Sequence, residues 1–260
     1  MASKEITFAP IGVFHSNQVQ PYEAGRQPDE FHSEGVIELE TGHNFEQALT
    51  GLDGCERIWV IFSFHHNPHW NPMVLPPRGR DTKIGVFATR SPYRPNSIGM
   101  SCVKVLRIEK LKIYVAGADL LDGSPILDIK PYVAYADSFP GVEPLWLQDS
   151  TKHSVGFSEK ALEQLDFLES RGVSQLKSFL QHQLEYEPTN SKKKRVKADG
   201  DSFVIAYRTW RAIFSLNETQ VLVEKIFSGY SEEDLQNQDD PYSDKDIHRN
   251  FKTLFLSLER

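Results

Sequence analysis

The segment 85–106, GVFATRSPYRPNSIGMSCVKVL, holds a dense set of side chains that can do chemistry. Two apolar runs flank a polar loop whose arginine forks suit carboxylates and phosphates. Two prolines restrict the backbone there, so the loop is expected to be stiff and to present its cations with little ordering cost. A rigid barrel turn with solvated charges fits the same residues, so both interpretations stay open. The loop residues that carry this argument are Arg90, Pro92, Arg94, Pro95 and Asn96.

Three histidines, His65, His66 and His69, follow an apolar run and raise the question of a metal site. Adjacent histidines at the end of a strand are expected to point to opposite faces, an arrangement that seldom binds one ion. The dipeptide Asn67-Pro68 indicates a turn. The sequence therefore predicts polar loop histidines and no metal.

The carboxylates Asp119 and Asp122 resemble the pair that a hydrolase uses. Asp122 more simply serves an Asp-Gly turn, since Leu121 to Ser124 carries a hairpin signal. No G-x-S-x-G motif is present, and Cys102 lies in an apolar run that predicts a buried strand. Nucleophilic catalysis thus has no support.

These residues lie within a succession of short apolar segments between Ile6 and Val133. The segments are rich in Ile, Val, Phe and Tyr and are separated by Gly, Pro, Asp and Asn, which indicates strands. Many short strands with few helices between them predict an antiparallel or mixed barrel. The expected strands are 6–14, 35–40, 57–66, 83–89, 101–108, 112–121 and 126–133, with one helix at 44–52.

The pattern changes after a connection expected at 134–157. Helical spacing predicts helices at 158–172, capped by Ser158, and at 173–186. Strands are expected at 203–216 and 220–228, meeting at Asn217-Glu218, with a last helix at 243–259. The fold class is therefore mainly β: a β-barrel domain at 1–140 and a small α+β domain at 155–260.

The composition of the chain is that of an ordinary globular protein, with 39% hydrophobic and 25% charged residues. The net charge of −7 argues against a generally cationic nucleic-acid coat protein, although one local basic face remains compatible with it. The N-terminus lacks the apolar run of a signal peptide, and no stretch is long enough to span a bilayer. Cys55 and Cys102 are expected to be buried free thiols in the cytoplasm.

Several separate motifs resemble the TrmO family, also called TsaA or YaeB-like. They are RQP at 26–28, WVIFSFHH ending at His66, RSPYRPNSIGMS from Arg90, and DLLDGSPILDIKPY from Asp119 to Tyr132. The motifs occur in matching order over the first half of the chain, which is a more specific signal than one short pattern. Family members are S-adenosylmethionine-dependent tRNA N6-methyltransferases built on a β-barrel.

The resemblance implies a cofactor site in loops of the barrel near a homodimer interface. A methionyl carboxylate needs a cation, for which Arg90 or Arg26 is a candidate, while ribose hydroxyls suit Asp119. The glycine-rich turn with which ordinary methyltransferases hold this cofactor is missing, in keeping with an unusual fold. The implied cofactor-binding residues are Arg26, Gln27, Pro28, His65, His66, Arg90, Met100, Ala116, Gly117, Ala118 and Asp119.

The family's substrate is threonylcarbamoyladenosine beside the anticodon, at tRNA position 37. Its N–H is more acidic than that of adenosine, so a strong base is not required, and Asp119, Asp128 and His65 are all candidates for one. Expected substrate-binding residues are Arg94, Asn96, Lys130 and Tyr132, for phosphate or carboxylate contacts and base stacking. Lys130 and Tyr132 are equally well explained as alternate residues that face outward at the end of a strand, without contact to substrate.

The C-terminal half departs from the family pattern. Bacterial relatives carry Asp-Pro-Arg-Pro-x-Tyr, whereas this chain reads LEYEPTNSKKKRVKADG. The basic run from Lys192 to Arg195 is either a substitute that contacts phosphates or a solvated loop. The acidic tract 231–240 is expected to be solvated.

Two other functional hypotheses remain at this stage. One is a barrel that binds S-adenosylmethionine or RNA and transfers nothing. The other is a metal-dependent hydrolase that uses the histidines. The leading hypothesis is the tRNA methyltransferase.

Overall fold

The computed structural model describes residues 6–18, 34–79, 81–147 and 150–256. The chain divides into two compact units, Met1–Leu145 and Trp146–Arg260. None of the helices formed by the described residues is long and apolar enough to cross a membrane.

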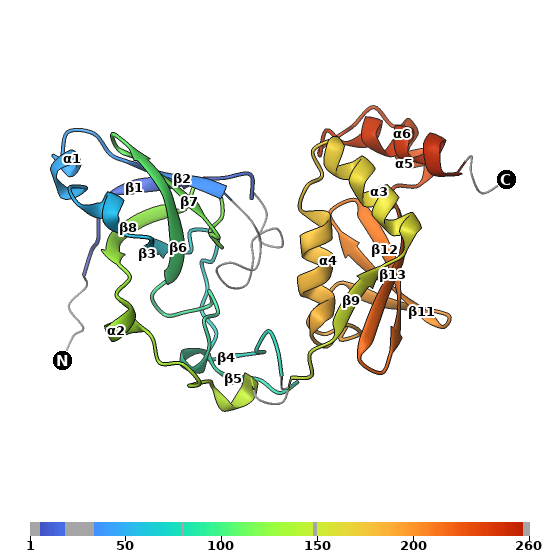
Figure 1. Cartoon of the computed structure of the whole chain (residues 1–260), viewed down its shortest axis with the longest axis horizontal. Coiled ribbons are helices and arrows are strands. Elements are labelled where there is room, and N and C mark those ends of the chain that lie inside the picture. The colour runs from blue at the N-terminus through green and yellow to red at the C-terminus, as the bar shows by residue number, and fades with distance from the viewer. Residues whose placement is uncertain (1–5, 19–33, 80, 148–149, 257–260) are drawn as a thin grey trace. The chain divides into compact units, whose positions relative to one another are not determined.

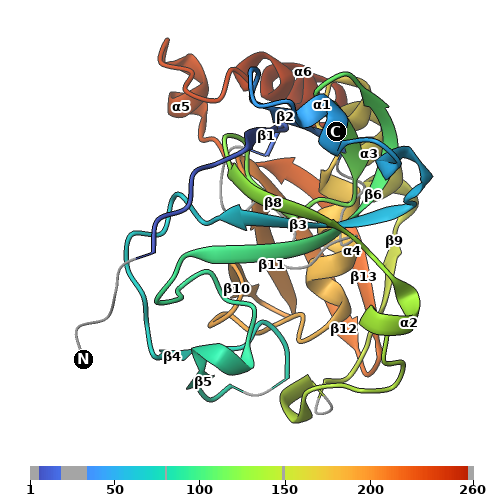
Figure 2. The same cartoon turned by 90° about the vertical axis from the view of Figure 1, so that its left-hand side faces the viewer.

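The first unit is a closed barrel of strands in the order β1-β2-β7-β6-β3-β8 (Figure 1). Every neighbouring pair is antiparallel, and β3 and β8 run side by side across the barrel in Figure 2. The barrel strands are β1 (Gly12–His15), β2 (Glu34–Leu39), β3 (Arg57–Ser63), β6 (Ile98–Glu109), β7 (Lys112–Ala116) and β8 (Pro125–Pro131). The predicted β-barrel is confirmed.

Alternation along the strands builds the barrel's core. In β3 the side chains of Ile58, Val60 and Phe62 point inward and are almost fully buried, while the residues between them face outward. Gly99 of β6 stands directly over the Phe62 ring, so closely that a Cβ there would lie 2.4 Å from a ring carbon. The core therefore depends on a glycine at this point.

Short elements fill the connections of the barrel. They are α1 (Phe45–Ala48), η1 (Leu52–Gly54), β4 (Met73–Val74), β5 (Ile84–Gly85), η2 (Val86–Ala88), α2 (Ala134–Asp137) and η3 (Leu145–Leu147). Cys55 and Cys102 are free, as expected, but only half-buried.

Three expectations for this unit are wrong. The strand predicted at 6–14 begins only at Gly12, as β1, and residues 6–11 form no strand. The strand predicted at 83–89 is only β5, which pairs with β4 outside the barrel and runs into the 3-10 turn η2. Leu121 to Ser124 do form a turn, with the Ser124 amide 3.2 Å from the Leu121 carbonyl, but not a hairpin. The strands on either side, β7 and β8, lie apart in the barrel because β6 and β3 stand between them.

The second unit is a five-stranded sheet, in the order β10-β11-β12-β13-β9, with helices. Only β9 runs parallel to its neighbour. Its elements are β9 (Ser154–Phe157), α3 (Glu159–Ser170), α4 (Leu176–Glu185), β10 (Val196–Asp199), β11 (Ser202–Tyr207), β12 (Trp210–Asn217), β13 (Gln220–Ser228), α5 (Glu232–Gln236) and α6 (Lys245–Leu256).

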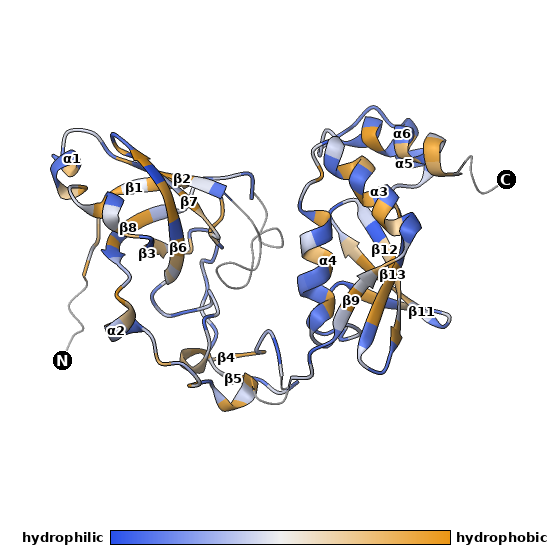
Figure 3. Ribbon diagram, viewed as in Figure 1, coloured by the Kyte–Doolittle hydropathy of each residue, from blue (hydrophilic) through white to orange (hydrophobic). Residues whose placement is uncertain are grey.

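The predicted helices of this unit are present. The Ser158 hydroxyl caps α3 by accepting from the Ala161 amide at 3.0 Å. Apolar and polar residues alternate along α3 and α4, as Figure 3 shows. The turn predicted at Asn217-Glu218 is also present, with Asn217 paired to Gln220.

Three boundaries in this unit differ from the expectation. The strand predicted at 203–216 is two strands, β11 and β12, because the chain reverses at Arg208, whose φ is 48°. The end of the supposed connection is β9, and part of the basic stretch is β10. The acidic tract contains the helix α5, whose Leu235 is buried.

A buried polar network fastens α6 to the sheet. His248, fully buried, lies 2.7 Å from the Ser228 hydroxyl and 3.0 Å from that of Thr209, and its ring stacks on Trp210 with centroids 3.6 Å apart. Thr209 donates to the Asp244 carboxylate at 2.6 Å. Burial opposes the charge of Asp244, but hydrogen bonds from His248 and Thr209 outweigh it and hold the pKa of Asp244 below its ordinary value.

Candidate functional site

One end of the barrel gathers most of the predicted site. β3 ends where β6 begins, since Ser63 pairs with Ile98, and β7 ends where β2 begins, since Ala116 pairs with Glu34. The end of β1 and the start of β8 meet at the same end. We call this end the rim; it comprises residues 15–18, 34–35, 63–72, 86–97 and 117–125.

The arginine loop is tied to the segment that follows β3. The Phe64 amide donates to the Ser97 carbonyl at 2.8 Å, and the Asn71 amide to the Tyr93 carbonyl at 3.1 Å. Two predicted site segments, around His65 and around Arg94, are therefore neighbours.

Arg94 braces its own loop. Its Nη1 donates to the carbonyls of Val86, at 3.2 Å, and Thr89, at 2.9 Å. This guanidinium closes the turn between η2 and β6, a different use from the substrate contact that we predicted for it. Arg90 and Asn96 are exposed on the same loop.

His65 and His66 lie against each other, so the prediction that they face opposite sides is wrong. Their ring centroids are 4.0 Å apart because both residues lie in a turn beyond the end of β3, where strand alternation no longer applies. Burial and then the neighbouring charge of His66 lower the pKa of His65. A neutral His65 is thus favoured near pH 7. Among the described residues no group of three His, Cys, Asp or Glu is arranged to hold a metal ion.

The segment Ala116–Asp119 closes the barrel end from inside. Ala118 and Leu120 are almost fully buried, and the Asp119 carboxylate accepts a hydrogen bond from the buried Ser101 hydroxyl. Ser101 points inward on β6, which orients Asp119 at the rim.

Met100 lies on the other side of the same strand. It is 51% exposed and points outward, in one cross-strand row with Ile61 of β3 and Asp128 of β8. Within one copy of the chain, β6 therefore separates Met100 from Asp119.

Lys130 and Tyr132 lie progressively farther from the rim along the direction of β8, beyond Asp128, which pairs with Ile61 of β3. Lys130 forms an ion pair with Asp128 at 2.9 Å, and the Tyr132 amide donates to the backbone carbonyl of Arg57 at the start of β3. Arg57 is six residues from Ser63, about 20 Å along the strand. The structure does not bring Lys130 and Tyr132 together with Arg90 or His65.

Gln18, which the sequence did not single out, has an unsatisfied amide at the rim. The residue is 1% exposed, and its side-chain Oε1 and Nε2 are buried without a hydrogen-bond partner among the described residues. Its backbone carbonyl accepts from the Asp122 amide at 2.8 Å. Buried amides are rarely left unpaired, so this one indicates a missing ligand group. No sequence pattern marks it.

Arg26, Gln27 and Pro28 lie outside the described residues. They belong to the stretch that joins β1 to β2, whose two ends are both at the rim.

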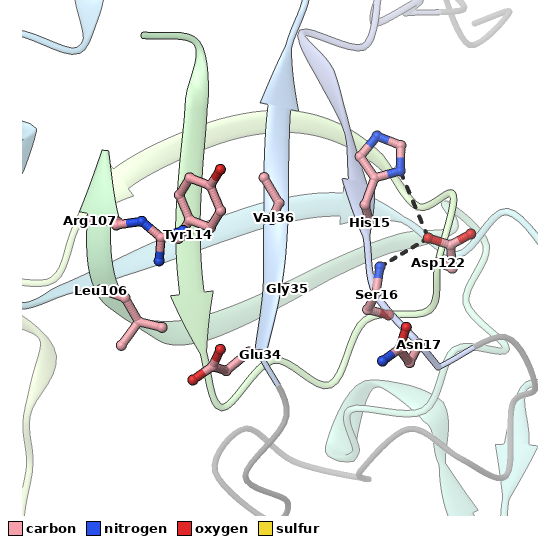
Figure 4. Close-up of a pocket in the computed structure, with 10 residues that line it drawn as sticks. All are labelled: His15, Ser16, Asn17, Glu34, Gly35, Val36, Leu106, Arg107, Tyr114 and Asp122. Carbon is pink, nitrogen blue, oxygen red and sulfur yellow. Dashed lines mark hydrogen bonds and ion pairs between the residues drawn. The ribbon is translucent and has the colours of Figure 1, made fainter. Parts of the chain in front are cut away.

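A hollow of about 430 Å³ begins at the rim and extends over the barrel's outer face (Figure 4). His15, Val36, Tyr114 and Arg107 form a cross-strand row there. The Arg107 guanidinium stacks on the Tyr114 ring at 3.4 Å, and Asp122 accepts from the Ser16 amide at 3.0 Å. None of the predicted site residues that the structure describes is among those lining this hollow.

Comparison with known proteins shows the family to which this barrel belongs. The family model of the tRNA-methyltransferase O N-terminal domain matches residues 13–138. The chain is 33% identical over 219 residues, 80% of its length, to the tRNA (adenine(37)-N6)-methyltransferase of Escherichia coli, 91% of which is covered. The chain belongs to the tRNA-methyltransferase O family.

Two further relatives agree with this membership. A putative S-adenosylmethionine-dependent methyltransferase of Pseudomonas aeruginosa is 38% identical, over 61% of this chain and 68% of that protein. The crystal structure of TrmO from Pseudomonas aeruginosa aligns with a TM-score of 0.60 and 27% identity, covering 86% of this chain and 98% of that one. Both units therefore have a counterpart within the tRNA-methyltransferase O family.

The rim suits the cofactor of this family. S-adenosylmethionine carries an adenine with hydrogen-bond donors and acceptors, ribose hydroxyls and a zwitterionic tail. The unsatisfied Gln18 amide can pair with the adenine, and the oriented Asp119 carboxylate can accept from the ribose hydroxyls. The exposed Arg90 can pair with the carboxylate of the tail. The described residues thus fit the group.

Proposed function

We propose that this chain methylates N6 of the adenine at position 37 of tRNA, with S-adenosylmethionine as methyl donor. The observation that carries the proposal is the match to the Escherichia coli tRNA (adenine(37)-N6)-methyltransferase over 91% of that enzyme. The rim supports it, because its polar groups fit this donor. By the family resemblance, the substrate base is threonylcarbamoyladenosine.

The protein's task in this reaction is alignment and exclusion of water. The bound cofactor supplies an electrophilic methyl group on a sulfonium. We propose that Arg90 holds its carboxylate, Asp119 its ribose and Gln18 its adenine. Gly117 and Ala118 form the closed floor beneath, since both are buried at the barrel end.

Asp119 is also the best-placed group to receive the proton that N6 loses. Its carboxylate is held at the rim by Ser101, whereas Asp128 is engaged by Lys130 on the barrel's outer face. His65 is a second acceptor at the rim, because its lowered pKa leaves it neutral. A strong base is not needed for the acidic N–H of the carbamoylated nucleoside.

We further propose that the enzyme works as a cytoplasmic homodimer. Apolar side chains on the outer face of β3 and β6 support this assembly. Ile98 is 38% and Met100 51% exposed, with Trp59 and Ile61 beside them on β3. A second copy that covers this face would then contact Met100, a predicted cofactor residue that points away from Asp119.

Analysis of tRNA nucleosides tests the activity. Mass spectrometry of tRNA from a strain without the gene should show loss of one methyl group on threonylcarbamoyladenosine, restored by the wild-type gene. Purified protein should transfer labelled methyl from the donor to that tRNA. Unchanged nucleosides would overturn the proposal. Tight donor binding without transfer would favour a non-catalytic binding module.

A further inference from the structure

The five-stranded sheet of the second unit has two unlike faces. Side chains that point to one face are buried beneath helices: Ile205, Ala212 and Ile226 pair across three strands there, and Trp210 stacks on His248 of α6. Tyr207 packs on Phe179 of α4 at 4.6 Å on this same face. The helices α4 and α6 thus lie on one face, and the alternate side chains point to the opposite one.

That opposite face carries four cations in two adjacent cross-strand rows. In the first row Arg211 pairs with Ala206, whose amide donates to the Arg195 carbonyl. In the second, Lys197 pairs with Val204, Val204 with Ile213, and Ile213 with Lys225. We call this surface the cationic sheet face; it comprises Arg195, Lys197, Arg211 and Lys225, with apolar residues between them.

The cations are close enough to influence one another. Burial and then the charge of Arg195 lower the pKa of Arg211, whose Nη1 donates to the carbonyls of Arg208 and Trp210. With strands about 4.8 Å apart, the four side chains span roughly 10 to 15 Å. This spread covers more than one phosphate of a nucleic acid strand. Two carboxylates lie on the same strands: Asp199 at the end of β10 and Glu224 in the bulge of β13.

One helix of this unit, α3, carries the opposite charge on its exposed side. The exposed residues of α3 include Glu159, Glu163, Asp166 and Glu169. A polyanion is therefore repelled from α3 and attracted to the cationic sheet face.

Two lysines of the basic run at 192–195 contribute little to an outward charge, whereas Arg195 of the same run belongs to the cationic sheet face. The Lys193 side chain is 1% exposed and its Nζ lies 2.8 Å from Glu187 Oε1. The Lys194 Nζ donates to the carbonyls of Gln183 and Tyr186 at the end of α4. These two lysines hold the connection between α4 and β10 in place.

We propose that the cationic sheet face binds the phosphate backbone of the substrate tRNA. This inference rests on the proposed function and adds to it the surface through which the second unit takes part. The contacts are to phosphates, so they strengthen binding of every tRNA alike, while the choice of base belongs to the barrel.

The test compares tRNA binding by two matched double charge reversals in the full chain. Lys197→Glu/Lys225→Glu removes the second row of the cationic sheet face. Lys160→Glu/Lys177→Glu makes the same change of net charge in the first turns of α3 and α4, where glutamate suits the helix dipole. The probe is tRNA from a strain without the gene, measured by fluorescence anisotropy between 0.05 and 0.3 M salt, roughly the range where phosphate contacts dominate.

The sheet variant should raise the Kd for tRNA at least about tenfold near 0.1 M salt and lower the slope of log K against log salt by about two. Its KM for tRNA should rise in parallel. The Kd for S-adenosylmethionine should stay within about twofold, and the helix variant should bind tRNA like wild type. Lys197→Gln/Lys225→Gln should show a smaller loss in the same direction, which guards against a folding defect in the glutamate variant.

Equal tRNA affinity in the two glutamate variants would overturn the inference. A fall in the tRNA affinity of the sheet variant without a change in its slope of log K against log salt would also overturn it. These outcomes are separate from failure of the proposed function, in which the wild-type enzyme itself leaves the tRNA unmethylated.

Discussion

Gln18 is fully enclosed at the rim, yet its side-chain amide has no hydrogen-bond partner in the part of the chain that the structure describes. An unpaired buried amide lowers the free energy of unfolding by about 1 to 3 kcal/mol, unless a ligand satisfies it. Gln18→Leu should therefore leave the unliganded protein as stable as wild type or more so, and weaken donor binding about tenfold. Thermal unfolding with and without S-adenosylmethionine measures both. A variant with lower stability and unchanged affinity would show that the amide has a structural role.

Arg90 follows a well-ordered turn, since the Thr89 hydroxyl donates to the Val86 carbonyl at 2.9 Å and accepts from the Ser91 amide. A charge-assisted pair with the donor's carboxylate is worth about 1.5 to 3 kcal/mol. Arg90→Ala should raise the Kd for S-adenosylmethionine on the order of ten- to hundredfold by calorimetry. Arg107→Ala, on the barrel's outer face, is the matched control and should bind normally. Equal losses in both variants would refute a specific role for Arg90.

The histidine pair makes the rim sensitive to pH. Burial and the charge of His66 lower the pKa of His65, so the folded protein binds fewer protons than the unfolded chain below pH 6.5, and protonation there opposes folding. His66→Gln should raise the pKa of His65 toward its ordinary value of 6.5 without restoring it fully, because burial remains. Titration of the ring protons by NMR measures this. An unchanged His65 titration would exclude a charge effect of His66.

At the scale of elements, the barrel depends on Gly99. A Cβ at this position would lie 2.4 to 2.7 Å from three atoms of the Phe62 ring, which is itself packed edge-on against Phe64. Gly99→Ala should lower the free energy of unfolding by roughly 1 to 3 kcal/mol, as overpacking does elsewhere. Gly85→Ala is the control, since nothing lies within 4 Å of its Cβ position. Urea unfolding compares the two, and similar midpoints would contradict the packing argument.

The sequence predicts an element well when neighbouring residues determine it, and poorly when contacts between distant segments do. The α3 cap at Ser158 and the apolar run that forms β3 are local patterns, and both elements were predicted. The reversal at Arg208 was not, because no glycine, asparagine or proline marks it. The turn at Asp122-Gly123 was recognisable, but which strands it joins is decided by barrel closure.

The same distinction holds for the site. The family motifs predicted residues that the fold gathers at one rim, such as His65 and Asp119. The outward position of Met100 was not foreseen, because the strand was expected to begin at Ser101, which left Met100 in the preceding loop. Gln18 stands out only through its burial, a property of the folded chain.

At the scale of the whole molecule, substitutions on the outer face of β3 and β6 test the proposed homodimer. Ile98→Asp should convert a homodimer into monomers in sedimentation measurements at micromolar concentration. Leu106→Asp is the control, because Leu106 lies near the other end of β6, is similarly exposed at 41%, and borders the hollow instead. A monomeric wild-type enzyme, or equal dissociation by both variants, would rule out this interface.

The outward position of Met100 has a genetic consequence under this assembly. If each active centre draws Met100 from one copy and Asp119 from the other, a chain damaged at either residue alone forms only defective pairs. Mixing the two damaged chains creates hybrids in which both lesions fall in one centre and the second centre is intact. Two inactive alleles expressed together would then complement each other. Each hybrid dimer would have at most half of the wild-type activity.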